Sequence, residues 1–512
     1  MKQLVELIGI YSGDRRSRRT PFGRSNRSYA AKLYHLIASE VVDSDTTAII
    51  ALFGENTAAT RRIYARTKYK LQQHLVNLIL ARETADREDP QIRNTPAQLL
   101  RQLYAIQVIL SRGGIVSGVS LAKRLLKRAE EAELYHIAHQ LVRILRRVYA
   151  IVLADRNLYD QYQAKFESYK ILMDAIEEAE SMYFDLALDI SHQKNRTEEF
   201  RAKLDKYTAA VRKMKVPMRS SRLFYYRQVI PIIRAMTLYH YAEAERLLER
   251  AIDGLRELPN YQPSQLVSFY INLIKCQVYL RKFEKGQRRI EEALKLVKAG
   301  SFNWFQFKIA QMTLAFYAER YDYAVKVYSD VRGRRRYHKL AKPYRELWDM
   351  YLLWMRILDK VGKLDLPRKY KSRHYNISHY VHNLKLFKRD KEGFNANIRI
   401  AQFFWHLAYE DFHALYEMEE ALQRYRRRYA KSKVPLERRT NIMFGYIIGL
   451  IKREFVYGHC LQITKTALRK LEETPMGADE EFNFDIEIIP YDIVINYTME
   501  LLAQYRLKPG HS

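Results

Sequence analysis

The chain has 512 residues, of which 48% are hydrophobic and 29% charged, and only 18 are glycine and 13 proline. This composition excludes an intrinsically disordered chain and, because helix breakers are scarce, disfavours an architecture of sheets and tight turns. Lys and Arg number 88 against 58 Asp and Glu, a formal net charge of +30, which favours acidic partners. The two cysteines, Cys276 and Cys460, exclude a disulfide framework and a cysteine-only zinc site.

The N-terminal part of the chain lacks a targeting pattern. Glu6 interrupts its apolar stretch, and the arginines follow this stretch rather than precede it. No run of about 18 apolar residues occurs, so no transmembrane helix is expected and the protein is predicted to be soluble and cytoplasmic. Residues 1–28 are predicted to form a basic N-terminal segment that is flexible, because six arginines between residues 11 and 28 are mixed with Gly, Ser, Pro and Asn.

Apolar residues recur at helical spacing from residue 29 onward, which predicts an N-terminal helical region over 29–110. Within it, residues 44–75 show a short helix, a Gly-Glu-Asn turn and a basic helix, an order that resembles a DNA-binding helix-turn-helix. Arg61, Arg62 and Tyr64 would then lie at the front of the recognition helix. The favoured alternative is an ordinary helical hairpin, because such hairpins are the commonest unit of all-helical proteins.

The glycines of SRGGIVSGVSLAKR, from residue 111, precede a predicted helix, as they do in loops that bind phosphate. The P-loop spacing is missing, because Val119 stands where that motif needs lysine. We therefore interpret Gly113 and Gly114 as a helix stop and Ser117 or Ser120 as a helix cap.

A helical repeat array is predicted over 111–365. In its second helices an aromatic residue is followed by a small residue at +3, a bulky one at +7 and a small or apolar one at +10, all on one helix face. The small residues let a neighbouring helix approach closely. The pattern is clearest at Tyr241, Ala244, Leu248 and Ala251, at Phe283, Gly286, Ile290 and Ala293, and at Tyr321, Ala324, Tyr328 and Val331.

These segments resemble the second helices of tetratricopeptide repeats, and Leu273 and Cys276 stand where the first helix of that repeat has a leucine and a small residue. Ala244, Gly286 and Ala324 are 42 and 38 residues apart, more than the roughly 34 of that repeat, so the resemblance is to a degenerate array. It implies an all-α fold, a right-handed superhelix of stacked antiparallel helix pairs with a concave binding face, and a scaffold without catalytic residues.

The periodicity breaks at residues 366–394, a predicted basic irregular connector, and further helical repeats are predicted over 395–472. His374, His379 and His382 lie in the connector, but no carboxylate completes a metal-ligand set, so we expect no metal there. Residues 473–512 are predicted to form an acidic loop and a C-terminal cap. Within them, the alternation at 482–495 indicates a short strand pair or an extended connector before a terminal helix.

Arginine, lysine and tyrosine recur together, most densely in VRGRRRYHKLAKPYR at 331–345. Guanidinium groups bind phosphates and interleaved tyrosines can stack on bases, whereas a single basic run is more often a solvated loop. Because similar clusters recur along the chain, both interpretations stay open. The candidate polyanion-binding residues are Arg61, Arg62, Arg66, Arg332, Arg334, Arg335, Arg336, Lys339, Arg424, Arg426, Arg427 and Arg428.

No G-x-S-x-G, H-E-x-x-H or dinucleotide motif is present, and we expect neither catalysis nor a cofactor. The primary prediction is a non-enzymatic interaction scaffold that docks a protein partner on the concave surface of the repeats. The alternative is a protein that binds RNA or DNA through its Arg, Lys and Tyr clusters. Arginines that converge on one face would favour nucleic acid, and scattered arginines would favour a protein partner. The sequence indicates no oligomeric state.

Overall fold

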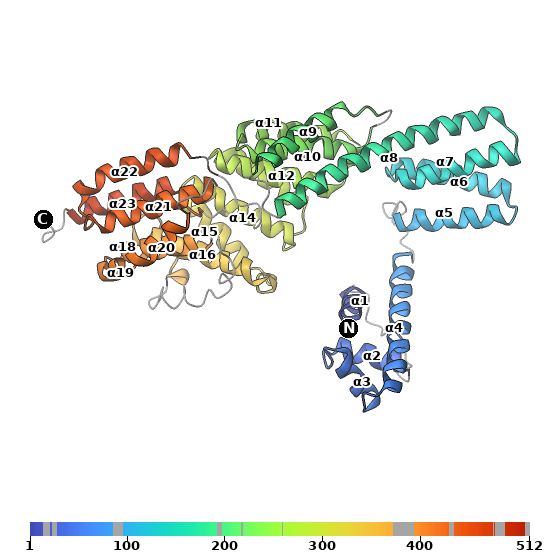
Figure 1. Ribbon diagram of the computed structural model, residues 1–512, viewed down its shortest axis with the longest axis horizontal. Helices are drawn as coiled ribbons and strands as arrows, with labels where there is room; N and C mark the ends of the chain where they lie inside the picture. The colour runs from blue at the N-terminus through green and yellow to red at the C-terminus, as the bar shows by residue number, and fades with distance from the viewer. Residues whose placement is uncertain are drawn as a thin grey trace. The chain divides into compact units, whose positions relative to one another are not determined.

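The computed structural model describes residues 1–13, 21–22, 28–84, 96–191, 197–216, 219–258, 260–371, 394–429, 435–474, 476 and 487–506. The regular secondary structure of these residues is helical, and the fold is all-α as predicted (Figure 1). The chain divides into two compact units, Met1–Tyr169 and Lys170–Ser512, so the repeat array predicted over 111–365 spans both of them. No helix among the described residues is long and apolar enough to cross a membrane.

The first unit begins with four helices around one core, namely α1 (Lys2–Gly13), α2 (Tyr29–Ala38), α3 (Asp45–Phe53) and α4 (Ala58–Thr84). Leu4, Ile8 and Tyr11 of α1 are buried in this core, because their spacing places them on one helix face. The prediction of a flexible segment over 1–28 is therefore wrong for residues 2–13. Of the arginine-rich remainder, only residues 21, 22 and 28 are described.

The rest of the first unit contains α5 (Pro96–Ser111), α6 (Ile115–Glu131), α7 (Tyr135–Arg147) and a π-helical turn (Val148–Val152), and α8 (Arg156–Ser191) continues into the second unit. Gly113 has a φ of 85° and separates α5 from α6. A Cβ on Gly114 would stand 2.7 Å from Ile109 Cγ2. The predicted serine cap is wrong, because Gly114 is the N-cap of α6 and Ser117 and Ser120 lie inside the helix.

The second unit is built from helix pairs that follow one another along the chain. Consecutive helices pack together, and α12 also packs against α14, which is the pattern of stacked pairs. The helices are α9 (Glu198–Lys213), α10 (Ser221–Thr237), α11 (Tyr241–Arg256), α12 (Pro263–Tyr279), α13 (Phe283–Lys295), α14 (Phe302–Tyr317), α15 (Tyr321–Arg332), α16 (Lys342–Lys360), α18 (Phe394–Ala408), α19 (Phe412–Glu417), α20 (Glu419–Tyr429), α21 (Pro435–Ile451), α22 (Tyr457–Glu472) and α23 (Tyr491–Arg506).

The turn inside successive helix pairs has one repeated geometry. The residue just past the first helix is left-handed, with φ of 60° at Tyr239, 52° at Arg281 and 55° at Glu319. The next N–H then donates to a carbonyl five residues earlier, a Schellman closure. These bonds run from His240 to Ala235, from Lys282 to Gln277 and from Arg320 to Ala315, at 2.8–2.9 Å. An all-α helical-repeat fold follows, because the same backbone unit recurs along the chain.

The small residues of the predicted repeat face lie between packed helices. Gly286 is buried, and a Cβ there would stand 2.7 Å from Leu314 Cδ2, so the glycine allows α13 and α14 to approach closely. The aromatic positions differ, since Tyr321 is buried whereas Tyr241 and Phe283 are half-buried. The alanines of this face, all fully buried, are Ala244, Ala251, Ala293 and Ala324.

Helix α23 packs against α22 and, across a small cavity, faces α16 and α18 (Figure 1). Arg281 Nη2 is 2.7 Å from Asp492 Oδ2 of α23, and the hydroxyls of Tyr321 and Tyr497 are 2.9 Å apart. The cavity left between α16, α18 and α23 measures only about 20 Å³. The core therefore runs without interruption from α14 to α23.

The predicted strand pair or extended connector at 482–495 is wrong for residues 491–495, which form the first turns of α23, whereas the predicted terminal helix is confirmed. Ile493, Val494 and Ile495 are all buried, because neighbours cover this helix on several sides, and two-sided burial removes the amphipathic period that identifies a helix. Residues 487–490 are buried and non-helical, and residues 482–486 lie outside the described part of the chain.

Candidate binding surfaces

The arginine-rich loop after α15 is largely engaged within its own unit. The guanidinium carbon of Arg332 lies 4.5 Å from the centre of the Tyr337 ring, and Tyr337 is itself buried. Arg334 Nη2 is 2.7 Å from Asp330 Oδ1, and Arg336 Nη1 donates to the Gly300 carbonyl at 3.3 Å. Three of the candidate arginines thus stabilise the loop, and the buried tyrosine is not available to stack on a base.

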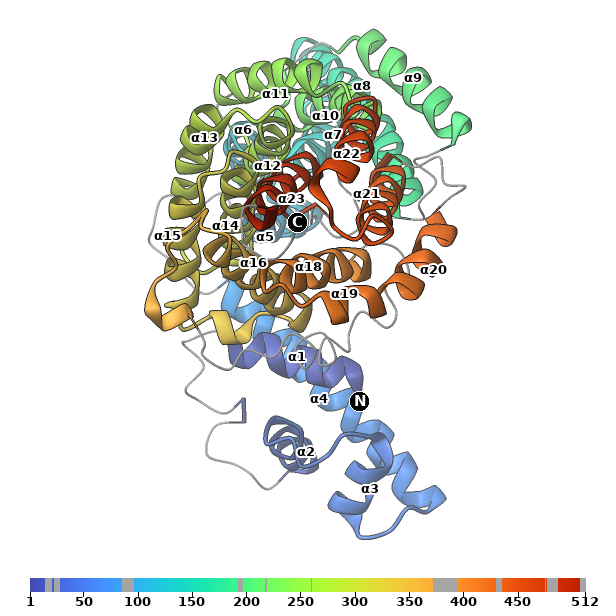
Figure 2. The same cartoon turned by 90° about the vertical axis from the view of Figure 1, so that its left-hand side faces the viewer.

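Arg335 and Lys339 of the same loop are exposed, and the structure gives them no partner among the described residues. The second cluster lies on α20, where Arg424, Arg426 and Arg427 are exposed. The side chain of Arg428 lies outside the described part. Figure 2 shows α15 and α20 on different sides of the second unit, so these two basic clusters do not converge.

The basic helix α4 presents a surface of another kind. Arg61, Arg62 and Arg66 are exposed, as is the neighbouring Lys70, and no Asp or Glu occurs between residues 56 and 82. Arg61 Nε donates to Asn56 Oδ1 at 2.7 Å. This face of α4 therefore carries a positive charge that is not balanced by carboxylates of its own helix.

Tyr64 does not belong to that exposed face, contrary to the prediction. It is buried, and its hydroxyl donates to Asp45 Oδ1 of α3 at 2.6 Å. Lys68 Nζ pairs with the same carboxylate at 2.9 Å. Tyr64 and Lys68 lie four residues apart on the side of α4 that faces α3, so they hold the two helices together.

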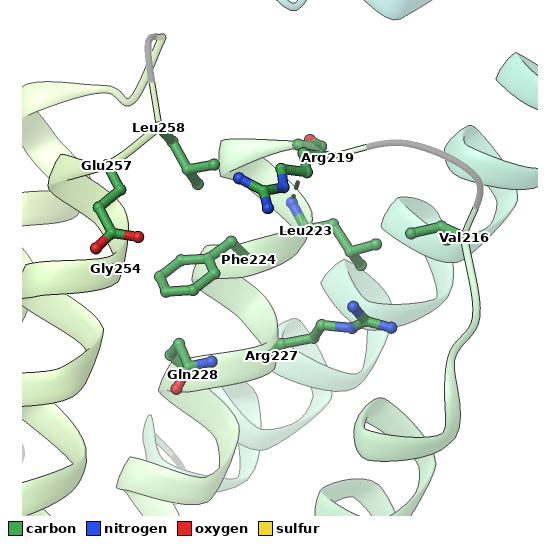
Figure 3. Close-up of a pocket in the computed structure, with 10 residues that line it drawn as sticks. Val216, Arg219, Leu223, Phe224, Arg227, Gln228, Gly254, Glu257 and Leu258 are labelled. Carbon is green, nitrogen blue, oxygen red and sulfur yellow. Dashed lines mark hydrogen bonds between the residues drawn. The ribbon is translucent and has the colours of Figure 1, made fainter.

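A cavity of about 530 Å³ opens between the start of α10, the end of α11 and the segment that follows α9, and is called here the α10 pocket (Figure 3). Its apolar lining comes mainly from Leu223, Phe224 and Leu258, and its charged lining from Arg219, Arg227 and Glu257. Histidine, cysteine and lysine do not occur among its lining residues, and its serine, Ser220, caps α10 by accepting a bond from the Leu223 N–H at 3.4 Å. The lining is therefore suited to binding and offers no pair of a nucleophile and a base.

Arg227 is the most constrained cation of the α10 pocket. Its Nη2 donates to the carbonyl of Met214, the C-cap residue of α9. Its Nε is buried and has no hydrogen-bond partner, and among the described residues no carboxylate pairs with it. Burial lowers the pKa of the Arg227 guanidinium, which indicates a charge held in a poorly solvated place. An anion in the pocket would compensate the charge of Arg227.

Gly254 shapes the opposite wall of the pocket. A Cβ on this residue would stand 2.8 Å from Cζ of Phe224, so only glycine lets the Phe224 ring lie against α11. In Figure 3 the ring separates Glu257, on the α11 side, from Arg227. The pocket therefore has an apolar middle with opposite charges on its two sides.

Sequence reasoning missed both the α10 pocket and a buried ion pair. Arg219 and Arg227 come from one stretch of the chain and Gly254 from a later helix, so their meeting at one cavity depends on the tertiary fold. The buried pair joins Arg439 of α21 to Glu487, which is 48 residues away in sequence. His374, His379 and His382 lie outside the described residues, within which no group of three or more metal-binding side chains occurs.

No family model and no curated protein matches the chain. Among solved structures, one titled "Structure of phAimR-Ligand" aligns with 83% of this chain and 99% of its own, with 11% sequence identity and a TM-score of 0.34. A likeness at this level carries no argument about ligand or partner.

Proposed function

We propose that this chain is a non-enzymatic interaction protein that docks a protein partner on its helical-repeat surface, and that its helix pairs are degenerate tetratricopeptide repeats. The observation that carries the proposal is the α10 pocket, where an apolar wall adjoins Arg227, which has no carboxylate partner among the described residues. Concave pockets with apolar walls and a few oriented polar groups are the usual form of a binding site.

The position of the pocket changes where we expect the partner to dock. From α14 onward the described helices share one continuous buried core, to which α23 contributes. The α10 pocket lies on α10 and α11, near the beginning of the second unit. We therefore place the docking surface there.

The distribution of charge agrees with a protein partner for the second unit. Its basic clusters on the α15 loop and on α20 lie apart, and several of their arginines are bound within the fold. Scattered cations provide long-range attraction to an acidic partner without forming a track for a phosphate backbone. The two cysteines are free and buried, which suits a reducing compartment, and we place the protein in the cytoplasm.

The test is selection of binders from a library of synthetic peptides with free C-termini. The wild-type protein is compared with Gly254→Leu, in which a side chain displaces Phe224 into the α10 pocket. The proposal predicts a family of related peptides whose binding to the variant is at least about tenfold weaker, the loss expected from a blocked hydrophobic subsite. Equal binding to both proteins, or no enriched peptide, would refute docking at this pocket.

A second candidate function rests on α4. Its exposed cations Arg62, Arg66 and Lys70 have no partner among the described residues, and Tyr69 beside them is 62% exposed, so the face offers phosphate contacts and an aromatic surface. We propose that this face of α4 binds nucleic acid.

The experiment is a salt titration of binding to labelled duplex DNA and single-stranded RNA, using a variant with Arg62, Arg66 and Lys70 changed to glutamine. Each lost phosphate contact should reduce the slope of log affinity against log salt by roughly 0.7 to 0.9. The control carries Arg334, Arg335 and Arg336 changed to serine and should behave nearly as the wild type. A control that loses as much affinity as the α4 variant would contradict this assignment.

A further inference from the structure

We infer that the α10 pocket binds an amphipathic carboxylate, either a small organic acid or the free C-terminus of a peptide, with the anion at Arg227 and the apolar part against Phe224. The inference deepens the proposed docking function and rests on it for the peptide form of the ligand. Its evidence is the geometry of the cavity, its apolar lining, and the position of Arg227, which has no carboxylate partner among the described residues.

The cationic end of the site is built by two elements. Arg227 comes from the second turn of α10, and its bond to the Met214 carbonyl fixes the guanidinium at the end of α9. Arg219 precedes α10 and lines the same cavity. A carboxylate in the cavity would accept from the guanidinium of Arg227, a charge-assisted bond. The N-terminus of α10 adds a favourable dipole.

The apolar end of the site determines which group of the ligand can bind beside the carboxylate. Leu223 and Leu258 are buried, and Phe224 is half-buried with its ring held against Gly254. A cavity of about 530 Å³ has room for one or two side chains of a peptide or for an aryl-alkyl acid. Burial of such a group provides affinity, and the carboxylate provides orientation.

Glu257 restricts the charge of the ligand. Its carboxylate lies on the α11 side of the pocket, across the Phe224 ring from Arg227 (Figure 3). A second negative charge on the ligand would meet it, so the site favours a monoanion over a phosphate dianion or a diacid. A backbone N–H or an ammonium group on the α11 side would be tolerated.

The experiment measures binding of three probes by calorimetry: an N-acetylated tripeptide ending in leucine with a free carboxylate, the same peptide with a C-terminal amide, and 4-phenylbutyrate. The variants are Arg227→Gln, Arg227→Lys and Gly254→Leu. The control is Arg250→Gln, because Arg250 lies on α11 outside the pocket lining and, among the described residues, donates to the Arg246 carbonyl of its own helix. We expect the free acid to bind at least about tenfold more tightly than the amide.

Arg227→Gln should reduce affinity for the free acid to that of the amide, Arg227→Lys should retain part of it, and Arg250→Gln should leave it unchanged. Equal binding of acid and amide, both lost in Gly254→Leu, would overturn the carboxylate inference and leave docking intact. Binding of 4-phenylbutyrate without either peptide would support the carboxylate site and refute a peptide partner there. Absence of binding by every probe would refute the carboxylate inference, and the library selection would then decide the docking proposal.

Discussion

Replacing Glu487 by glutamine should destabilise the second unit more than any exposed charge substitution. Glu487 and Arg439 each expose only 3% of their side chains. The guanidinium donates through Nε and Nη2 to the Glu487 carboxylate, and through Nη1 to the carbonyls of Leu471 and Thr474 at 2.8 Å each. This arrangement joins α21 to the end of α22 and to the segment that enters α23.

The expected loss follows from what remains after the substitution. Glutamine has nearly the same size as glutamate but no charge and one acceptor oxygen instead of two, so Arg439 would stay buried with neutral acceptors only, and the amide NH₂ would face the guanidinium. Removing one partner of a buried pair typically costs about 3–5 kcal/mol, because the remaining charge is uncompensated. Glu487 also accepts from the Tyr491 N–H at 3.2 Å, so the start of α23 would lose a cap.

Urea unfolding of the full chain, followed by circular dichroism, measures the loss. The control is Arg469→Gln, which breaks a pair with Glu473 whose side chains are 68% and 61% exposed, and which should cost less than about 1 kcal/mol. The double variant Arg439→Met with Glu487→Leu should recover most of the stability, since an apolar pair can replace a buried ion pair. A loss for Glu487→Gln no larger than that of the control would refute this reasoning.

Three further substitutions test local features. Glu40 is exposed and has a left-handed backbone with φ 57°. Its replacement by glycine should raise the free energy of unfolding, measured by thermal denaturation, by about 0.5–1 kcal/mol, and an unchanged value would contradict backbone strain at this residue. Gly286→Leu should cost roughly 1–3 kcal/mol in urea unfolding by overpacking against Leu314, and an unchanged midpoint would show that α13 can move. Although burial pushes the pKa of Asp45 up, hydrogen bonds from Tyr64 and Lys68 lower it from 3.8 to about 2. The stability that this group contributes is thus complete above its ordinary pKa and is lost as pH falls towards 2. Asp45→Asn should therefore flatten that part of the curve of unfolding free energy against pH. A variant curve parallel to that of the wild type would contradict the lowered pKa.

The features that the sequence predicted are those encoded within one helix. The small residues Ala244, Gly286 and Ala324 could be assigned to helix faces, because each lies at helical spacing from the aromatic and bulky residues of its own helix. The ion pair between Asp330 and Arg334 is likewise a local feature, because the two residues are four positions apart. These local signals were enough for an all-α repeat fold.

The features that were missed depend on residues far apart in sequence. Arg439 and Glu487 meet across 48 residues, and the α10 pocket needs Arg227 and Gly254 from two helices. The packing of α23 could not be predicted, because its apolar residues face several neighbours. Helical periodicity of apolar residues identifies a buried face only when one side of the helix is buried. In the arginine loop, charge density suggested a polyanion site, whereas contacts to Tyr337 and Gly300 engage the guanidinium groups of Arg332 and Arg336.

Hydrogen–deuterium exchange of the full chain, with and without a peptide selected from the library, tests the central claim most directly. Docking at the α10 pocket predicts slower exchange of backbone amides in residues 219–228 and 254–258, and no such change in Gly254→Leu. Protection confined to α4 or to α21–α23, with residues 219–228 unchanged, would contradict the assignment of the binding site.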